Sequence, residues 1–218
     1  MRAYKGKIVL LLPLLLLVSS MVLVGKTGKS QFDSRTLEVP VHSLESGDVV
    51  FRKGTSMTSL TVSWLDRTAL YTHVGLVLVE NDVVEVIHAV PGDRYNELGP
   101  PTVIKESLGE FFSHDGVVAI SVQRISIDPD SGIAARAADA AVSFVEQGVL
   151  FDGAFDLETT DKMYCTELVW RAYKIAGIDL IHGVFDEVRS PFLAKKVIFT
   201  STLLQSSYFT EVASATIH

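Results

Sequence analysis

The only cysteine of the chain, Cys165, lies in the segment YCTELVWRAY, and two histidines, His73 and His88, lie in apolar segments upstream of it. A thiolate is the nucleophilic form of cysteine, and a nearby imidazole commonly removes the thiol proton. A lone buried cysteine or a lone strand histidine is more often structural. The three together predict acyl transfer through a thioester, with Cys165 as the nucleophile.

A helix must position Cys165. Apolar side chains after it recur at intervals of three and four residues, and Gly177 is a plausible stop. At a helix start, unpaired amides and aligned peptide dipoles favour negative charge, so we expect a lowered thiol pKa and N–H groups for an oxyanion. Tyr164 is a candidate for shaping the oxyanion or substrate site, although an aromatic side chain there more often only packs.

A β-hairpin must position the histidines. The segment THVGLVLVENDVVEVIHAVPG contains two β-branched runs separated by a polar turn. If Asn81 and Asp82 form the turn, the residue numbers of two residues that face each other across the hairpin add up to about 163. His73 then lies beside His88. A slip of one residue would instead offer Glu85. We favour His88 as the third residue of the site and keep Glu85 as the alternative.

The rest of the chain from residue 41 alternates short strands with two helices. The pattern predicts one α+β domain, with an antiparallel sheet packed against the helix that carries Cys165. The other expected elements are a strand within 44–54, a short helix or ordered loop at 55–71, a turn or short helix at 108–116, a strand at 117–125, a helix at 131–148 and a last strand at Lys196–Ser201.

The amino terminus has a different composition. Basic residues precede the run from Ile8 to Gly25, which carries no charge. Its 18 residues barely reach the length needed to cross about 30 Å of hydrocarbon. We interpret residues 1–27 as a signal anchor, with a cleaved signal peptide and a buried helix as alternatives, and 28–40 as a tether. The basic flank would keep the domain at 41–218 outside the cytoplasm, on the membrane or exported.

Charge and motifs exclude several function classes. Beyond residue 32 the chain has 26 acidic residues against 14 basic ones, a balance that repels nucleic acid. No close-spaced metal-ligand pair of the usual kind, glycine-rich phosphate loop or GxSxG elbow occurs in the sequence. We therefore expect no metal, no other cofactor and no nucleic-acid partner.

Four segments resemble one family: SGDVVF at 46–51, THVGLVL at 72–78, VIHA at 86–89 and YCTELVWRAY at 164–173. They are similar to the circularly permuted branch of NlpC-type papain-like cysteine hydrolases. This branch includes the YiiX-like proteins and, more distantly, the lecithin:retinol acyltransferase group. Ordinary papain-like chains have the cysteine before the histidine, and a permutation explains the reversed order here. The resemblance spans residues 42–176 and implies a permuted papain-like fold.

The resemblance also implies roles. Cys165 would attack a carbonyl carbon, His73 would accept its proton, and His88 would orient His73. YiiX-like relatives often have an acidic residue where His88 stands, so the third role departs from that pattern. Together with a location outside the cytoplasm, these roles favour cleavage of amide bonds in cell-wall peptides. A lipid acylhydrolase or acyltransferase and a non-catalytic envelope binding module are the alternatives. The oligomeric state is not predicted.

Overall fold

The computed structural model describes residues 41–55, 66–91, 102–113, 116–190 and 193–216, which belong to one compact unit. The expected anchor or signal peptide at 1–27 and the tether at 28–40 lie outside these residues, as does most of the expected helix or loop at 55–71. Within the described ranges, no helix is long and apolar enough to span a membrane.

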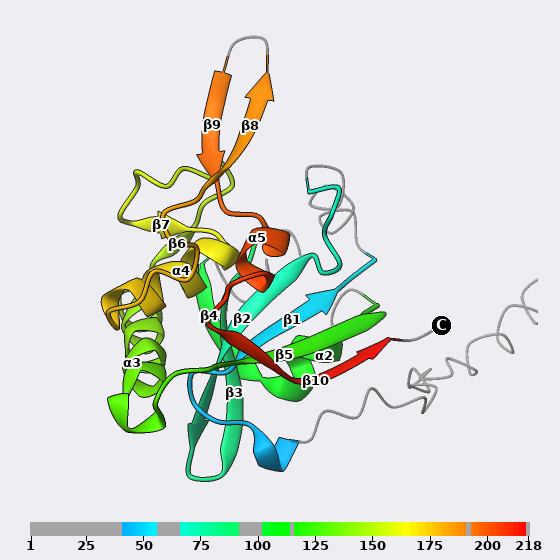
Figure 1. Ribbon diagram of the computed structural model, residues 1–218, viewed down its shortest axis with the longest axis vertical. Helices are drawn as coiled ribbons and strands as arrows, with labels where there is room; N and C mark the ends of the chain where they lie inside the picture. Colours follow the sequence, from blue (N-terminus) through cyan, green and yellow to red (C-terminus); the bar gives the residue numbers. More distant parts are fainter. Residues whose placement is uncertain (1–40, 56–65, 92–101, 114–115, 191–192, 217–218) are drawn as a thin grey trace, which may run out of the picture. The chain divides into compact units, whose positions relative to one another are not determined.

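A six-stranded antiparallel sheet forms the centre of the domain, with strand order β10-β5-β1-β2-β3-β4 (Figure 1). This confirms the predicted antiparallel sheet and the α+β class. The strands are β1 (Val49–Lys53), β2 (His73–Glu80), β3 (Val83–Ala89), β4 (Val103–Ser107), β5 (Ala119–Ile125) and β10 (Phe209–Thr216).

The remaining elements surround this sheet. The longer helices confirm the two predicted at 131–148 and from Cys165, and a hairpin of two strands projects from the domain (Figure 1). The bounds are η1 (Val41–Ser43), α2 (Leu108–Ser113), η2 (Pro129–Ser131), α3 (Ile133–Glu146), β6 (Leu150–Phe151), β7 (Lys162–Met163), α4 (Cys165–Ile175), β8 (Asp186–Ser190), β9 (Leu193–Val197) and α5 (Thr200–Leu204).

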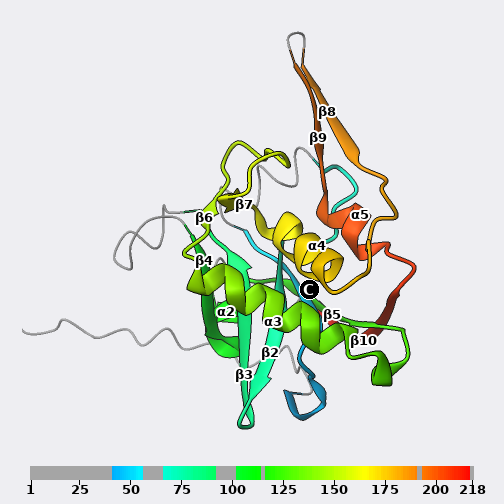
Figure 2. The ribbon, with the colours of Figure 1, turned by 90° about the vertical axis from the view of Figure 1, so that its left-hand side faces the viewer.

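The two faces of the sheet bury different cores. Val49 and Phe51 of β1 belong to the larger core, which includes the buried faces of α3 and α4, and Figure 2 shows these helices side by side over the sheet. Val50 belongs to the smaller core, together with Phe111 of α2. Because strand side chains alternate between faces, the near-continuous apolar run of β1 serves both cores.

The hairpin of β2 and β3 has the predicted register. Asn81 and Asp82 adopt positive φ angles of 50° and 65°, as a two-residue hairpin turn requires. Leu76 then pairs with Ile87, so paired positions sum to 163 as expected. The register prediction is confirmed, and it puts His73 and His88 on the same face of the sheet.

The carboxyl-terminal part differs from the prediction of one strand at Lys196–Ser201. Strand β9 ends at Val197, and α5 begins at Thr200. Distant carboxylates set this helix start, because Asp66 accepts a hydrogen bond from the Ser201 amide at 3.0 Å and Asp186 accepts one from the Phe199 amide at 2.8 Å. The prediction is therefore wrong beyond Val197.

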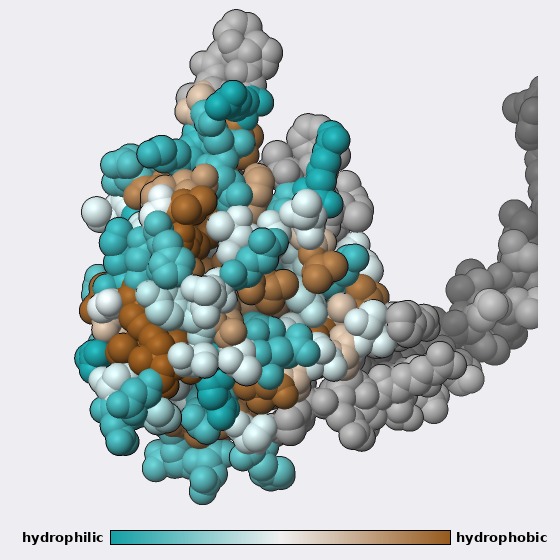
Figure 3. Space-filling model, in the orientation of Figure 1, coloured by the Kyte–Doolittle hydropathy of each residue, from teal (hydrophilic) through white to brown (hydrophobic). Residues whose placement is uncertain are grey.

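The surface is mixed on the face seen in Figure 3, where hydrophobic residues form separate patches among hydrophilic ones. Singly exposed apolar side chains are normal for a soluble domain surface and need no partner to explain them. In the described residues the large exposed ones are Val41, Leu70, Val83, Leu150, Ile175 and Val184.

Candidate active site

Cys165 is the first residue of α4 and is half-buried. Tyr164 before it is extended, with φ −102° and ψ 174°, which leaves the first amides of the helix without intrahelical acceptors. The backbone N–H groups of Val74, Thr166 and Cys165 itself are near enough to the Cys165 sulfur to lower its pKa. Val74 directly follows His73 in β2, so the sulfur lies beside the peptide unit that joins these two residues.

Burial raises the pKa of the Cys165 thiol to about 11, while the neighbouring backbone N–H groups and the positive charge of Arg52 act in the opposite direction. The expectation of a lowered thiol pKa is therefore wrong. A helix start supplies only partial charges, and here they do not offset the cost of removing a full negative charge from water. At neutral pH the side chain is a neutral thiol.

His73 and His88 are in direct contact. Nε2 of His73 lies 2.8 Å from Nδ1 of His88, and the ring planes are inclined by 76°. Gly75 makes room for this contact, because a Cβ atom there would lie 2.4 Å from Cγ1 of Val86 and 3.2 Å from Cβ of His88. A side chain at position 75 would push β2 and β3 apart where the two rings meet.

Helix α2 covers the histidine pair. The fully buried ring of Phe111 is stacked on His73, with centroids 5.7 Å apart, and meets His88 edge-on at 5.1 Å. The helix start is fixed by a reciprocal capping box, in which the Glu110 amide donates to the Ser107 hydroxyl and the Ser107 amide donates to the Glu110 carboxylate. Under this cover the His88 side chain is fully buried, and His73 is half-buried.

Glu106 of β4 also contacts the histidine pair. Its Oε1 atom lies 2.9 Å from Nε2 of His88. Glu106 pairs with Val86, two residues before His88, and so lies on the same face of the sheet. Sequence reasoning missed this residue because its segment carries no strand pattern strong enough to predict β4.

Glu85, the alternative third residue, lies elsewhere. It is three positions from His88 in β3, so its side chain is on the opposite face. Its carboxylate is 2.8 Å from Nζ of Lys105. The structure brings His73 and His88 together and does not bring Glu85 to them.

Tyr164 is next to Cys165, but its hydroxyl is engaged in the fold. The hydroxyl accepts a hydrogen bond from the Ile198 amide at 2.8 Å, and the ring is buried. Burial also raises the pKa of the Tyr164 hydroxyl, so it stays neutral. The contact joins the start of α4 to the segment after β9, which fits a packing role better than a role in binding an oxyanion.

Glu167 supports the same helix start. It is fully buried, accepts a hydrogen bond from the Tyr164 amide at 3.3 Å and forms an ion pair with Arg171 at 2.7 Å. Arg171 also donates to the Leu157 carbonyl at 2.9 Å, which fixes the loop before Cys165. Burial raises the pKa of Glu167 to about 7, although the Arg171 charge lowers it.

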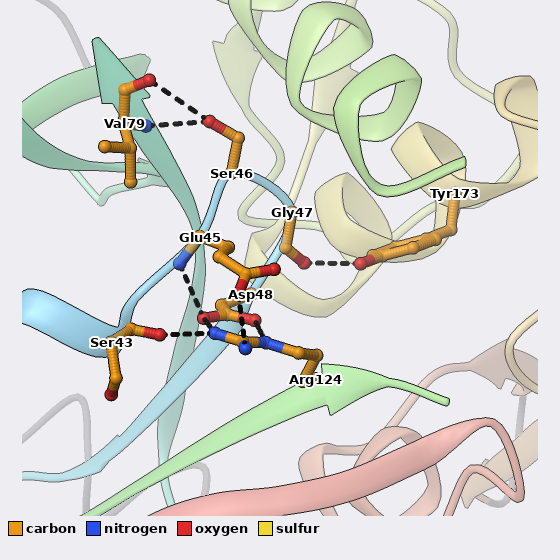
Figure 4. Close-up of polar contacts among 8 residues, drawn as sticks. All are labelled: Ser43, Glu45, Ser46, Gly47, Asp48, Val79, Arg124 and Tyr173. Carbon is orange, nitrogen blue, oxygen red and sulfur yellow. Dashed lines mark hydrogen bonds and ion pairs between the residues drawn. The ribbon is translucent and has the colours of Figure 1, made fainter. Parts of the chain in front are cut away.

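The turn before β1 joins the elements that carry the site (Figure 4). The Tyr173 hydroxyl of α4 donates to the Gly47 carbonyl, and the Arg124 guanidinium of β5 donates to both carboxylate oxygens of Asp48, at 2.8 and 2.7 Å. Gly47 has φ +94°, and a Cβ atom there would lie 2.6 Å from the Ala134 carbonyl oxygen of α3. Asp48 is therefore a structural residue.

In the described part of the chain, no group of three or more His, Cys, Asp or Glu residues is arranged to hold a metal ion.

Comparisons with known proteins identify the family. The model of the permuted papain-like amidase enzymes, the YaeF/YiiX or C92 family, matches residues 43–183, which include Cys165 and both histidines. The crystal structure of the metalloprotein YiiX from Escherichia coli O157:H7 is similar, with TM-score 0.60 and 19% sequence identity over 78% of this chain and 97% of that one. At that identity the likeness shows the fold alone. A search of curated proteins found no match. Because the family match covers more than half of the chain, the protein belongs to the permuted papain-like amidase family of the YaeF/YiiX type.

Proposed function

We propose that this protein is a thiol hydrolase that cleaves amide bonds of cell-wall peptides through a thioester, with Cys165, His73 and His88 as its site. One arrangement carries the proposal: the Cys165 sulfur faces the Val74 amide, and the preceding residue, His73, is hydrogen-bonded to His88. The backbone beside Cys165 is thus that of the residue pair His73–Val74, which supports His73 as the base and His88 as its orienting group in thiol acyl transfer.

The raised thiol pKa determines when the Cys165 proton is transferred relative to the attack on the substrate. Because Cys165 is protonated at rest, His73 would take its proton as the sulfur attacks the carbonyl carbon. The new C–S bond places negative charge on the carbonyl oxygen, and the backbone N–H of Cys165 at the helix start is a suitable donor to it. The imidazolium of His73 would then protonate the leaving amine, and the C–N bond would break.

The thioester would then be hydrolysed by water, with His73 again acting as the general base. His73, neutral again, would remove a proton from water as the oxygen attacks the thioester carbon, and the thiol would be regenerated when the C–S bond breaks. His88 would orient His73 throughout through the 2.8 Å contact. These steps use the side chains of the protein and water.

The substrate class is proposed from location. We propose that the apolar run at residues 8–25 holds or exports the domain outside the cytoplasm, where cell-wall peptides are an available class of amide. A lipid acyl ester or amide would be cleaved by the same chemistry. The substrate test must therefore include both classes.

The test uses the full-length protein with peptidoglycan-derived peptides and, separately, phospholipid vesicles. We expect release of a new amine from the peptides, detected by mass spectrometry, and complete loss in Cys165→Ala. Release of fatty acid without peptide cleavage would replace the proposed substrate class by a lipid. Turnover of neither substrate, together with full cellular function of Cys165→Ala, would favour a binding module and overturn the hydrolase proposal.

A further inference from the structure

The histidine pair continues to an acidic side chain on the next strand. His88 of β3 has a fully buried side chain, and Glu106 of β4, 9% exposed, approaches its Nε2 atom at 2.9 Å. Nδ1 of the same ring faces His73. Both nitrogens of His88 therefore have assigned neighbours, one carboxylate and one imidazole.

These neighbours determine where the protons lie. This contact does not have hydrogen-bond geometry, but an ionised carboxylate at 2.9 Å repels a nitrogen lone pair and attracts an N–H group. Nε2 of His88 must then carry the proton. A neutral imidazole has one donor and one acceptor nitrogen, so Nδ1 of His88 is the acceptor.

The same assignment of one donor and one acceptor nitrogen applies to the His73 ring. Its Nε2 atom faces an acceptor, Nδ1 of His88, at 2.8 Å and must donate to it. Nδ1 of neutral His73 is then left with a lone pair. That is the protonation state required of a general base, and it follows from the position of the Glu106 carboxylate next to His88.

We propose that Glu106 is a positioning residue that fixes the tautomers of His88 and His73, so that Nδ1 of His73 is the atom that receives the Cys165 proton. The last part of this inference rests on the proposed function. The tautomers themselves are a property of the resting protein and do not depend on any substrate.

The proton balance is simple. When Nδ1 of His73 takes the thiol proton, His73 becomes an imidazolium, and its Nε2–H continues to donate to His88. No second proton needs to move, and Glu106 stays ionised. Its negative charge lies beyond His88 and favours the cation that forms on His73.

The surroundings strengthen this effect. Phe111 packs against both imidazoles and excludes water from the ring surfaces that it covers, which strengthens the electrostatic effect of nearby charges there. The Arg52 guanidinium lies over the Phe111 ring, 4.6 Å from its centroid. The neighbouring cation of β4, Lys105, pairs instead with Glu85 on the other face.

The first test is nuclear magnetic resonance of the full-length protein labelled with ¹⁵N-histidine, with His73→Gln and His88→Gln used to assign the signals. Long-range ¹H–¹⁵N correlations distinguish the two tautomers of a neutral imidazole. We expect both rings of the parent protein to be Nε2-protonated at neutral pH. An Nδ1-protonated His88 in the parent would overturn the proposal, and this result does not require any variant of Glu106 to fold.

The second test is Glu106→Gln, whose amide can donate to Nε2 of His88 as well as accept from it. We expect His88 to lose its single tautomer. We also expect kcat to fall by roughly 10- to 100-fold with little change in KM. This loss is smaller than the ~10⁴-fold effect of neutralising a carboxylate that touches the base itself. Glu106→Asp, which keeps the carboxylate, should recover part of the loss. Glu80→Gln removes a carboxylate from the exposed end of β2 and is the matched control.

The two proposals fail separately. Unchanged tautomers in folded Glu106→Gln would overturn the positioning role while leaving hydrolysis by Cys165 intact. Altered tautomers in a protein whose parent hydrolyses no amide or ester would support the positioning of the rings and count against the proposed function.

Discussion

Nε2 of His73 lies 2.8 Å from Nδ1 of His88, and the two rings come from adjacent antiparallel strands. The contact requires the register in which paired positions sum to 163, a glycine at position 75 and a cover for both rings, which Phe111 provides. Sequence, turn geometry and a distant helix thus contribute to one hydrogen bond.

The first prediction separates the candidate third residues. His73→Ala should abolish amide hydrolysis, and His88→Ala should reduce kcat by roughly 10²-fold or more, because the base loses its orienting partner. Glu85→Gln should leave kcat within about twofold, since Glu85 pairs with Lys105 on the other face. Steady-state kinetics with the peptide substrate decide the matter, and a Glu85→Gln effect as large as that of His88→Ala would contradict the assignment.

The second prediction concerns thiol ionisation. Because burial raises the Cys165 pKa to about 11, alkylation by iodoacetamide should be slow at pH 7 and still rising with pH above 9, beyond the midpoint of an ordinary thiol at about 8.5. The measurement is the alkylation rate against pH, with circular dichroism to verify folding. A plateau below pH 7 that disappears in His73→Ala would instead reveal a preformed thiolate–imidazolium pair.

The third prediction tests the role of Gly75. Gly75→Ala should destabilise the domain by about 1–3 kcal/mol, because the added Cβ atom meets Val86 at 2.4 Å. It should also reduce activity by displacing His88. Urea unfolding of the full-length protein measures the first effect and kinetics the second.

Gly109→Ala in α2 is the matched control for Gly75→Ala. No atom lies within 4 Å of a Cβ atom built at Gly109, so this variant should be neutral or more stable by about 0.5–1 kcal/mol. Equal losses of stability in the two variants would show that steric contact at Gly75 is not the cause.

The fourth prediction follows from Glu167. Its pKa is raised from 4.5 to about 7 in the folded protein, so between these values the folded state holds more protons than the unfolded state. This residue therefore makes stability fall as pH rises from about 4.5 to 7, by up to roughly 3 kcal/mol. Below pH 4.5 the penalty is absent, and above 7 it is complete.

Glu167→Gln tests that contribution. The variant should gain stability relative to the parent as pH rises through this window, measured by urea unfolding at several pH values. Glu146→Gln, which replaces an exposed acid in the last turn of α3, should show no such trend. A stability difference between Glu167→Gln and the parent that does not change with pH would contradict the prediction.

The local sequence determined the parts of this protein that depend on short-range patterns. The apolar spacing after Cys165 predicted α4, and the Asn81–Asp82 turn predicted the hairpin and its register, because turn geometry and strand alternation act over a few residues. The neighbouring positions of His73 and His88 followed from that register alone.

Tertiary structure decided what depends on distant segments. Glu106 reaches His88 only because β4 pairs with β3, and α5 begins where Asp66 and Asp186, both far away in the chain, accept hydrogen bonds from its first turn. The direction of the Cys165 pKa shift also depended on the tertiary structure. A helix start visible in the sequence favours the thiolate, but burial, which disfavours it more strongly, is a property of the packed molecule.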